Sequence, residues 1–345
     1  MIVYWLMFLA PALAIVTPWR LDRRTANLMW FLIGAWFTIL IGFRYQVGGD
    51  WFNYLNGFER VKEFSLGMAA RYKDPGYSLL NWLVSEAGGS IYWVNLFCGT
   101  ILMIGTVQFC RRQPRPWPAL LVAVPYMLIV VGMGYTRQAT ALGFVLLGLA
   151  ALGEGRTLNF VLWVTLGAMF HKTAALLIPI AAFAGTRRRL WKFVWVLIAA
   201  VMVYRWVLQD QADTLWQNYV TADMESYGAG VRVAMNAVPA VLFFIFRKRL
   251  NPDGRDDRIW VWISLISLAC VPLVAMSSTA VDRMSLYFIP IQLYVFSRLP
   301  NLAGNQLNRS IVTLGIIGYY AAVQWTWLNL ATHARYWVPY HFAPL

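Results

Sequence analysis

Long apolar runs alternate with short polar segments along this chain of 345 residues. About 12 runs have the composition of membrane helices, which need roughly 20 apolar residues to cross a bilayer perpendicularly. Several runs are shorter, and flanking Trp and Tyr side chains are expected to extend them into the interface. The pattern predicts an all-α polytopic integral membrane protein with about 12 transmembrane or re-entrant helices. The runs lie at residues 2–16, 28–43, 91–109, 119–133, 139–152, 160–170, 174–184, 193–208, 233–246, 259–276, 284–296 and 311–330.

Two segments leave the number of spans open. Residues 76–86 are amphipathic and short, which favours a re-entrant or interfacial helix over a full span. Residues 160–184 can form one continuous helix or two short helices that meet near His171. A continuous helix would place the basic residues 187–192 outside, against the positive-inside rule. We therefore expect a break near His171, with this side chain at the outer face.

Composition and charge agree with a membrane protein. Hydrophobic residues make up 60% of the chain and charged residues 13%, whereas soluble proteins carry about 25% charged residues. The basic residues gather between apolar runs, which predicts that those loops are cytoplasmic and that both termini are outside. We expect one membrane domain over residues 1–345, with long outer loops at about 44–75 and 209–230. The clearest basic clusters are Arg20/Arg23/Arg24, Arg111/Arg112/Arg115, Arg187/Arg188/Arg189/Lys192 and Arg247/Lys248/Arg249.

Several classes of protein are disfavoured. The net charge of +14 does not indicate nucleic-acid binding, because the basic residues lie in short loops and form no basic domain. They are expected to contact the anionic lipid of the bilayer. Cys98, Cys110 and Cys270 lack metal-ligand spacing, and no Walker loop or zinc-protease motif is present. The sequence therefore predicts neither a metal nor a cofactor.

The first candidate residues follow the second apolar run. Arg44 ends this run, and Gly48-Gly49-Asp50-Trp51 and then Tyr54 come after it. The glycines permit a tight turn that would point Asp50 back toward the membrane surface. A structural alternative is that Arg44 anchors one helix end and Asp50 caps the next helix.

A second candidate, Arg137, lies between two apolar runs with almost no loop and is followed by Gln138. A charge so close to hydrocarbon is costly and needs a partner. An anionic ligand would serve, because the planar guanidinium matches phosphate oxygens. The alternative is an arginine that ends a helix and extends its charge to the interface.

The third and fourth candidates are also ionisable groups at the edges of apolar runs. A histidine in apolar surroundings is commonly a packing residue, but His171 is followed by Lys172 and Thr173. This polar step favours a general base, or a donor to a sugar or phosphate. Asp282 and Arg283 precede another apolar run, and these adjacent charges can simply pair with each other.

Together, these motifs resemble the EpsG/Wzy-like family of bacterial polysaccharide polymerases. The resemblance covers most of the chain, although it is less clear after Trp206. Each motif alone is weak, but their order and spacing together are fairly specific. Asp74 stands where a Glu is expected. The matching residues are Arg44 with Gly49-Asp50 and Tyr54, Asp74-Pro75-Gly76-Tyr77, Arg137-Gln138-Ala139, His171-Lys172-Thr173-Ala174 with Pro179, and Trp337-Val338-Pro339-Tyr340.

The resemblance implies a metal-independent glycosyltransferase at the periplasmic face of the bacterial inner membrane, with a GT-C-like architecture as one expectation. Its donor and acceptor would be undecaprenyl-diphosphate-linked oligosaccharides, and a chain-length regulator is an expected partner. The acceptor hydroxyl would displace undecaprenyl diphosphate from the donor's anomeric carbon. The expected catalytic residues are Arg137 and either Asp50 or His171 as the base. The expected substrate-binding residues are Arg44, Lys172 and Arg283 at the diphosphate, with Trp51, Tyr54, Tyr77 and Gln138.

Three rival functions remain. Transfer of glycan to another acceptor, as in O-antigen ligases, uses similar chemistry and is the main alternative. A flippase for lipid-linked oligosaccharide should have polar residues on both halves of its pathway, whereas polarity here is concentrated on one side. A membrane acyltransferase could use a histidine base, but no second signature of that class is present.

Overall fold

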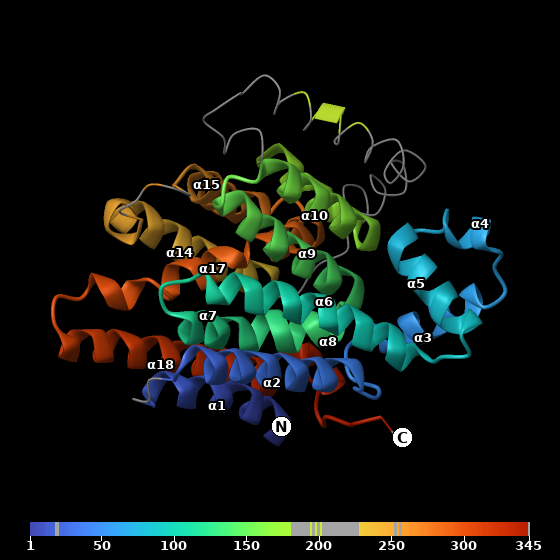
Figure 1. The fold of residues 1–345 in the computed structure, drawn as a ribbon, viewed down its shortest axis with the longest axis horizontal. Helices are drawn as coiled ribbons and strands as arrows, with labels where there is room; N and C mark the ends of the chain where they lie inside the picture. The colour runs from blue at the N-terminus through green and yellow to red at the C-terminus, as the bar shows by residue number, and fades with distance from the viewer. Residues whose placement is uncertain are drawn as a thin grey trace.

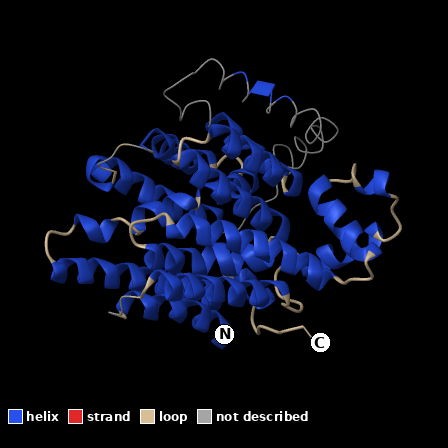
Figure 2. Cartoon of the chain, viewed as in Figure 1, coloured by secondary structure: helices blue, strands red, loops and turns tan. Residues whose placement is uncertain are grey.

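The computed structural model describes residues 1–17, 21–180, 194, 197–198, 201, 228–251, 254 and 257–343. These residues are predominantly helical and contain no strand (Figure 2). Among these described residues, six helical segments are long and apolar enough to cross a membrane, so the chain is a multi-pass membrane protein whose described part is all-α. The number of about 12 spans, the GT-C-like architecture and the single domain stay predictions. The six segments are α2 (Arg23–Gly42), α6 (Ile91–Arg111), α7 to α8 (Pro116–Gly134), α9 (Thr136–Gly153), α14 (Ala229–Leu250) and α18 (Gln306–Leu330).

Shorter helices fill the spaces between these segments (Figure 1). Within the segment from α7 to α8, the helix widens into a π-helix, η1, at Val124–Val131. Such segments often occur at functional sites. The predicted outer loop at 209–230 and the basic cluster at 187–192 fall mostly or entirely outside the described residues. The other elements are α1 (Ile2–Val16), α10 (Thr157–Phe170), η2 (Lys172–Leu177), α15 (Asp257–Leu273), α16 (Ser278–Ser285), η6 (Leu286–Phe288), α17 (Pro290–Phe296), η7 (Leu299–Leu302) and η8 (Thr332–Tyr336).

Helices α6 and α9 pack through glycines. A Cβ atom at Gly143 would lie 2.6 Å from the carbonyl oxygen of Ile101, and one at Gly105 would overlap the backbone of Gly143. Small residues allow membrane helices to approach this closely. The contact holds the first turns of the two helices together, so that Asn95 and Thr136 both reach the same side chain, Arg44.

One end of the bundle gathers basic segments that are distant in sequence. Arg111 at the end of α6 donates to Asn27 near the start of α2. Arg115 donates to Asn301 at 2.8 Å. The opposite ends of α2 and α6 meet at Arg44. The bundle therefore has a basic end, where these loops gather, and an opposite end near Arg44, which we call the second end. The alternation of basic loops with apolar runs predicts such a division. Further contacts at the basic end join Arg112 to Glu154, Arg298 to Gln113 and Arg249 to Leu302.

Three short helices lie together beside the second end of the bundle (Figure 1). They are α3 (Trp51–Val61), α4 (Leu66–Ala69) and α5 (Pro75–Glu86). The amphipathic helix expected at residues 76–86 is confirmed as α5, although its depth in the membrane stays a prediction. This lobe, which we call the α3–α5 lobe, follows the Gly48-Gly49 turn as the sequence indicates.

The predicted break at His171 is confirmed. Helix α10 ends at Phe170, and His171 has an extended backbone, with φ −155° and ψ 113°. A 3₁₀ helix follows at Lys172–Leu177. The break turns the imidazole of His171 toward α9, where it contacts Gln138.

The C-terminal segment fastens the loop that precedes the α3–α5 lobe. The amide of Tyr45 donates to the carbonyl of His341 at 2.9 Å, and the amide of Gly48 donates to the carbonyl of Tyr336 at 2.8 Å. Trp337 is buried, and its indole N–H donates to the carbonyl of Ile129 at 3.1 Å. The residues on either side of the Trp337-to-Tyr340 motif therefore hold the turn that leads to Asp50.

Candidate active site

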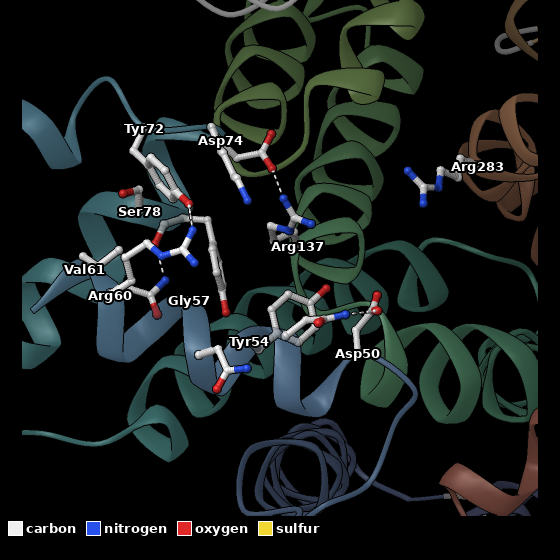
Figure 3. Close-up of a pocket in the computed structure, with 15 residues that line it drawn as sticks. Asp50, Tyr54, Gly57, Arg60, Val61, Tyr72, Asp74, Ser78, Arg137 and Arg283 are labelled. Atoms are coloured by element: carbon white, nitrogen blue, oxygen red, sulfur yellow. Dashed lines mark hydrogen bonds and ion pairs between the residues drawn. The ribbon is translucent and has the colours of Figure 1, made fainter. Parts of the chain in front are cut away.

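Two cavities meet at the junction of the bundle and the α3–α5 lobe, and Asp50, Tyr54, Arg137 and Arg283 line both. Figure 3 shows the residues that line the first of them. The first, which we call the lobe cavity, has a volume of about 470 Å³. The second, the bundle cavity, has a volume of about 240 Å³. The lobe cavity is also lined by Asn53, Asn56, Gly57, Arg60, Val61, Tyr72, Lys73, Asp74, Tyr77, Ser78 and Asn81. The bundle cavity is also lined by Tyr126, Val130, Tyr135, Gln138, His171, Arg232, Thr279, Asp282, Leu286, Trp327 and His333.

Arg137 occupies the wall between the two cavities. Its Nη1 lies 2.6 Å from Oδ2 of Asp74, and its side chain is 35% exposed, against 4% for Asp74. Its guanidinium carbon lies 5.8 Å from the ring centroid of Tyr54. Arg137 also belongs to the first turn of α9, where backbone amides add positive potential. The buried charge has the partner that its position requires, and the same group faces a space where an anion can bind.

Asp74, His171 and Gln138 form a buried chain beside Arg137. The amide nitrogen of Gln138 lies 3.0 Å from Nε2 of His171. Nδ1 of His171 lies 3.9 Å from Oδ2 of Asp74. Because an amide N–H can only donate, Nε2 accepts and the ring proton is assigned to Nδ1, facing the carboxylate. In this arrangement Nε2 is engaged by Gln138 and is not presented to a substrate.

Burial and neighbouring charges set the ionisation states of His171 and Asp74. Burial lowers the pKa of His171 below its ordinary value, despite the opposing effect of Asp74, and the charges of Arg137 and Arg283 lower it further. Burial alone would raise the pKa of Asp74, but its contacts with His171 and Arg137 hold it below the ordinary value. The stable state is a neutral imidazole beside an ionised carboxylate.

Acid should therefore destabilise the fold through His171. The unfolded chain takes up the proton at an ordinary pKa of about 6.5, whereas the folded ring resists protonation. The stability that this group contributes is present above that pH and is lost as the pH falls through it toward the lower folded pKa. We expect the melting temperature to fall between about pH 7.5 and pH 5.5, and His171→Gln to reduce that fall by about 2 °C or more. The exposed His333→Gln serves as the control, and an equal pH response in both variants would contradict this assignment.

Asp50 has a different setting. It occupies the residue before α3, but its side chain accepts no hydrogen bond from the helix backbone. Its Oδ1 instead accepts from the amide of Asn53 at 3.1 Å. The helix-capping alternative therefore does not describe this carboxylate. Asp50 lines both cavities, and this makes it a candidate to exchange a proton with a molecule bound there.

Arginines on two other helices face the bundle cavity. Arg232 at the start of α14 forms a two-point ion pair with Asp282 on α16, at 2.6 and 2.7 Å. The sequence left open that Asp282 pairs only with its neighbour Arg283. The structure shows that Asp282 also pairs with Arg232 and so links α16 to α14. Arg283 faces Arg137 across the cavity (Figure 3).

Three predicted substrate-binding residues line neither cavity. Arg44 is fully buried and donates to Ile41 O at 2.6 Å, Val47 O at 3.2 Å and Thr136 Oγ1 at 2.7 Å. Trp51 is also buried, with its ring centroid 5.7 Å from the guanidinium carbon of Arg44. Lys172 directly follows His171 in sequence, but it is not among the residues that line the two cavities. Arg44 and Trp51 thus brace the turn that leads to Asp50.

The remaining predicted residues come together. Tyr54 and Tyr77 lie edge to face, with centroids 5.7 Å apart, on the wall of the lobe cavity. Arg60 and Arg232 also line the cavities but were not among the predicted residues, and Asp74 was predicted only as part of a motif. Arg232 carried the same signal as Arg137, an arginine at the edge of an apolar run.

The polar groups of the two cavities suit an anionic saccharide. The bundle cavity contains Arg137, Arg232 and Arg283, whereas the lobe cavity adds amide and tyrosine side chains. Guanidinium groups bind phosphate oxygens by charge-assisted hydrogen bonds. Within the described ranges, no group of three or more His, Cys, Asp or Glu is placed to hold a metal ion. Metal independence itself stays a prediction.

Comparison with known protein families matches residues 27–342 to the EpsG family. The match spans nearly the whole chain and includes every residue that lines the two cavities. Comparison with curated proteins finds no match.

Proposed function

This chain belongs to the EpsG family, and we propose that it polymerises undecaprenyl-diphosphate-linked oligosaccharide repeats at the periplasmic face of the bacterial inner membrane. The family is associated with polysaccharide polymerisation, and the helices make the chain a multi-pass membrane protein. The observation that carries the proposal is the position of Arg137, which is paired with Asp74 and shared by two cavities. A transferase that joins two large substrates needs such a meeting point.

The proposed reaction is displacement at the anomeric carbon of the donor. The acceptor hydroxyl oxygen forms a bond to that carbon as the bond to the diphosphate oxygen breaks. The electron pair leaves with undecaprenyl diphosphate, and Arg137 and Arg283 stabilise the developing charge. Asp74 positions Arg137 by holding one edge of its guanidinium.

Asp50 accepts the proton of the attacking hydroxyl in this mechanism. The sequence left Asp50 and His171 as equal candidates. Engagement of Nε2 of His171 by Gln138 favours Asp50, which lines both cavities. Carboxylates perform the same step in inverting glycosidases. His171 then serves as a positioning residue, which orients Asp74 and Gln138.

Recognition of the sugars is assigned to the lobe cavity. Tyr54 and Tyr77 offer ring faces and edges, and Asn53 and Asn81 offer amide groups. Arg44, Trp51 and Lys172 are not part of this proposal, because they line neither cavity.

Reconstitution of the reaction tests the proposed function. The purified protein in detergent would be incubated with lipid-linked repeat units, and the products separated on a gel. A ladder of products supports a polymerase. One transfer to a different acceptor supports ligase-like activity, and the absence of covalent product contradicts both. The same incubation with a chelator tests metal independence, which predicts an unchanged ladder.

A further inference from the structure

Helix α5 carries polar side chains on the face that it turns into the protein. Its buried residues are Ser78 and Asn81, which are 4% and 2% exposed, whereas Leu83 on the same helix is 57% exposed. Asp74, which precedes the helix, is also buried. Residues at positions i, i+4 and i+7 share one face of a helix, so Asp74, Ser78 and Asn81 form one stripe, which we call the α5 polar face. Polar groups at this depth need hydrogen-bond partners.

Each side chain of the α5 polar face has one oxygen that makes no hydrogen bond to any described residue. These atoms are Oδ1 of Asp74, Oγ of Ser78 and Oδ1 of Asn81. The other oxygen of Asp74 accepts from Arg137 at 2.6 Å. Nδ2 of Asn81 donates to the carbonyl of Tyr77 at 2.6 Å. Because a carbonyl can only accept, this bond fixes the amide group and directs Oδ1 of Asn81 away from it.

Ser78 is the clearest of the three. A serine or threonine within a helix commonly donates to a carbonyl three or four residues earlier, and Thr100, Thr140 and Ser85 do so at 2.7–2.8 Å. Ser85 lies on the same helix as Ser78, but Ser78 makes no such bond to the described part of the chain. Buried polar groups nearly always have a partner. The α5 polar face lines the lobe cavity, so a molecule bound there can supply the partners.

We propose that the α5 polar face is the subsite that binds hydroxyl groups of the acceptor's terminal sugar. This inference rests on the proposed function and adds the residues that select the acceptor. The open oxygens of Asp74 and Asn81 can only accept hydrogen bonds, so the ligand must bring donors, whereas the hydroxyl of Ser78 can donate or accept. Sugar hydroxyl groups provide such donors. An ionised phosphate provides none, and the carboxylate of Asp74 would repel it, so the donor's diphosphate does not suit this face.

The location of the α5 polar face connects recognition of the acceptor with the proposed reaction. Asp50 and Arg137 line the same cavity as Ser78 and Asp74 (Figure 3). Asp74 holds Arg137 through Oδ2, which leaves Oδ1 for a hydroxyl of the sugar. One carboxylate therefore positions the arginine of the donor site and contacts the acceptor.

The test uses an acceptor that cannot act as a donor, namely the repeat oligosaccharide as its methyl glycoside, which carries no diphosphate. With saturating lipid-linked donor, Ser78→Ala should raise the KM for this glycoside about five- to tenfold, because one hydrogen bond to the sugar is lost. The kcat should change less than twofold, and the KM for the donor should stay at the wild-type value. The melting temperature should be equal or higher, since Ser78 has no partner in the free protein. Asn81→Leu, of similar size, should raise the same KM.

A matched control is Ser85→Ala, which removes a hydroxyl from the same helix outside the cavity and should leave both KM values unchanged. A wild-type KM for the glycoside in both Ser78→Ala and Asn81→Leu would overturn the subsite, as would an equal rise for donor and glycoside. A wild type that polymerises lipid-linked repeats but does not elongate the glycoside would also overturn it. In these cases the proposed function stands, whereas a wild type that forms neither product contradicts the function itself.

Discussion

Arg137→Lys is expected to abolish polymer formation although the positive charge is kept. The variant should lower kcat by about 100-fold or more, the usual loss when one group that stabilises a leaving charge is removed. Arginine can hold Asp74 with one edge of its planar fork and a phosphate with the other. An ammonium group is a single point of charge, and it cannot replace both contacts in one geometry. The measurement is the rate of ladder formation from lipid-linked repeats at saturating donor.

A matched variant controls for the chemistry of the substitution. Arg156→Lys changes an arginine that also pairs with a carboxylate, that of Glu154, at the basic end of the bundle. It should retain wild-type activity. The melting temperature of Arg137→Lys should stay close to that of the wild type, since Lys can still pair with Asp74. A full-length ladder from a folded Arg137→Lys protein would remove Arg137 from the diphosphate site.

Asp50→Asn is the second variant with a large expected effect. Loss of a general base typically lowers kcat by about 100- to 10,000-fold, and the amide cannot accept the proton of the acceptor hydroxyl. Binding of the donor should be nearly unchanged, because Asp50 lies at the junction and the diphosphate contacts come from arginines. Single-turnover kinetics with preformed donor complex separates the two effects.

Two further variants decide whether Asp50 is the base. Asp22→Asn alters a carboxylate that caps α2, and it should not change kcat. His171→Gln should lower kcat by much less than Asp50→Asn, because its Nε2 is engaged by Gln138. If His171→Gln removes activity and Asp50→Asn retains it, the two roles assigned here are reversed.

The sequence predicted much of the helical framework because the period and length of apolar runs are local properties. The break at His171 was foreseen from the positive-inside rule. The amphipathic helix α5 was foreseen from its pattern. Residues 194, 197, 198 and 201 apart, the chain between 181 and 227 lies outside the described residues, and so does the predicted arrangement of charges there.

The site was predicted less completely, because sequence shows which groups are costly to bury and not which partners satisfy them. Arg44 and Arg137 both end or begin an apolar run. The first is satisfied by backbone carbonyls, Asn95 and a threonine hydroxyl, and the second by Asp74. The partners come from different parts of the fold: Asn95 and Thr136 reach Arg44 from α6 and α9, whereas Asp74 reaches Arg137 from the start of α5. Arg232 was missed for the same reason, since its partner lies 50 residues away.

The orientation of the cavities in the membrane is the claim on which the proposed function depends, and labelling of single cysteines measures it directly. The native Cys98, Cys110 and Cys270 are buried, so introduced cysteines can be read against a low background. Asn56→Cys lies on the lobe cavity, and Asn301→Cys lies at the basic end beside Arg115. In spheroplasts, an impermeant maleimide should label Asn56→Cys at once and Asn301→Cys only after permeabilisation. Labelling of Asn301→Cys alone in sealed spheroplasts would place the arginine cavities in the cytoplasm and contradict the account.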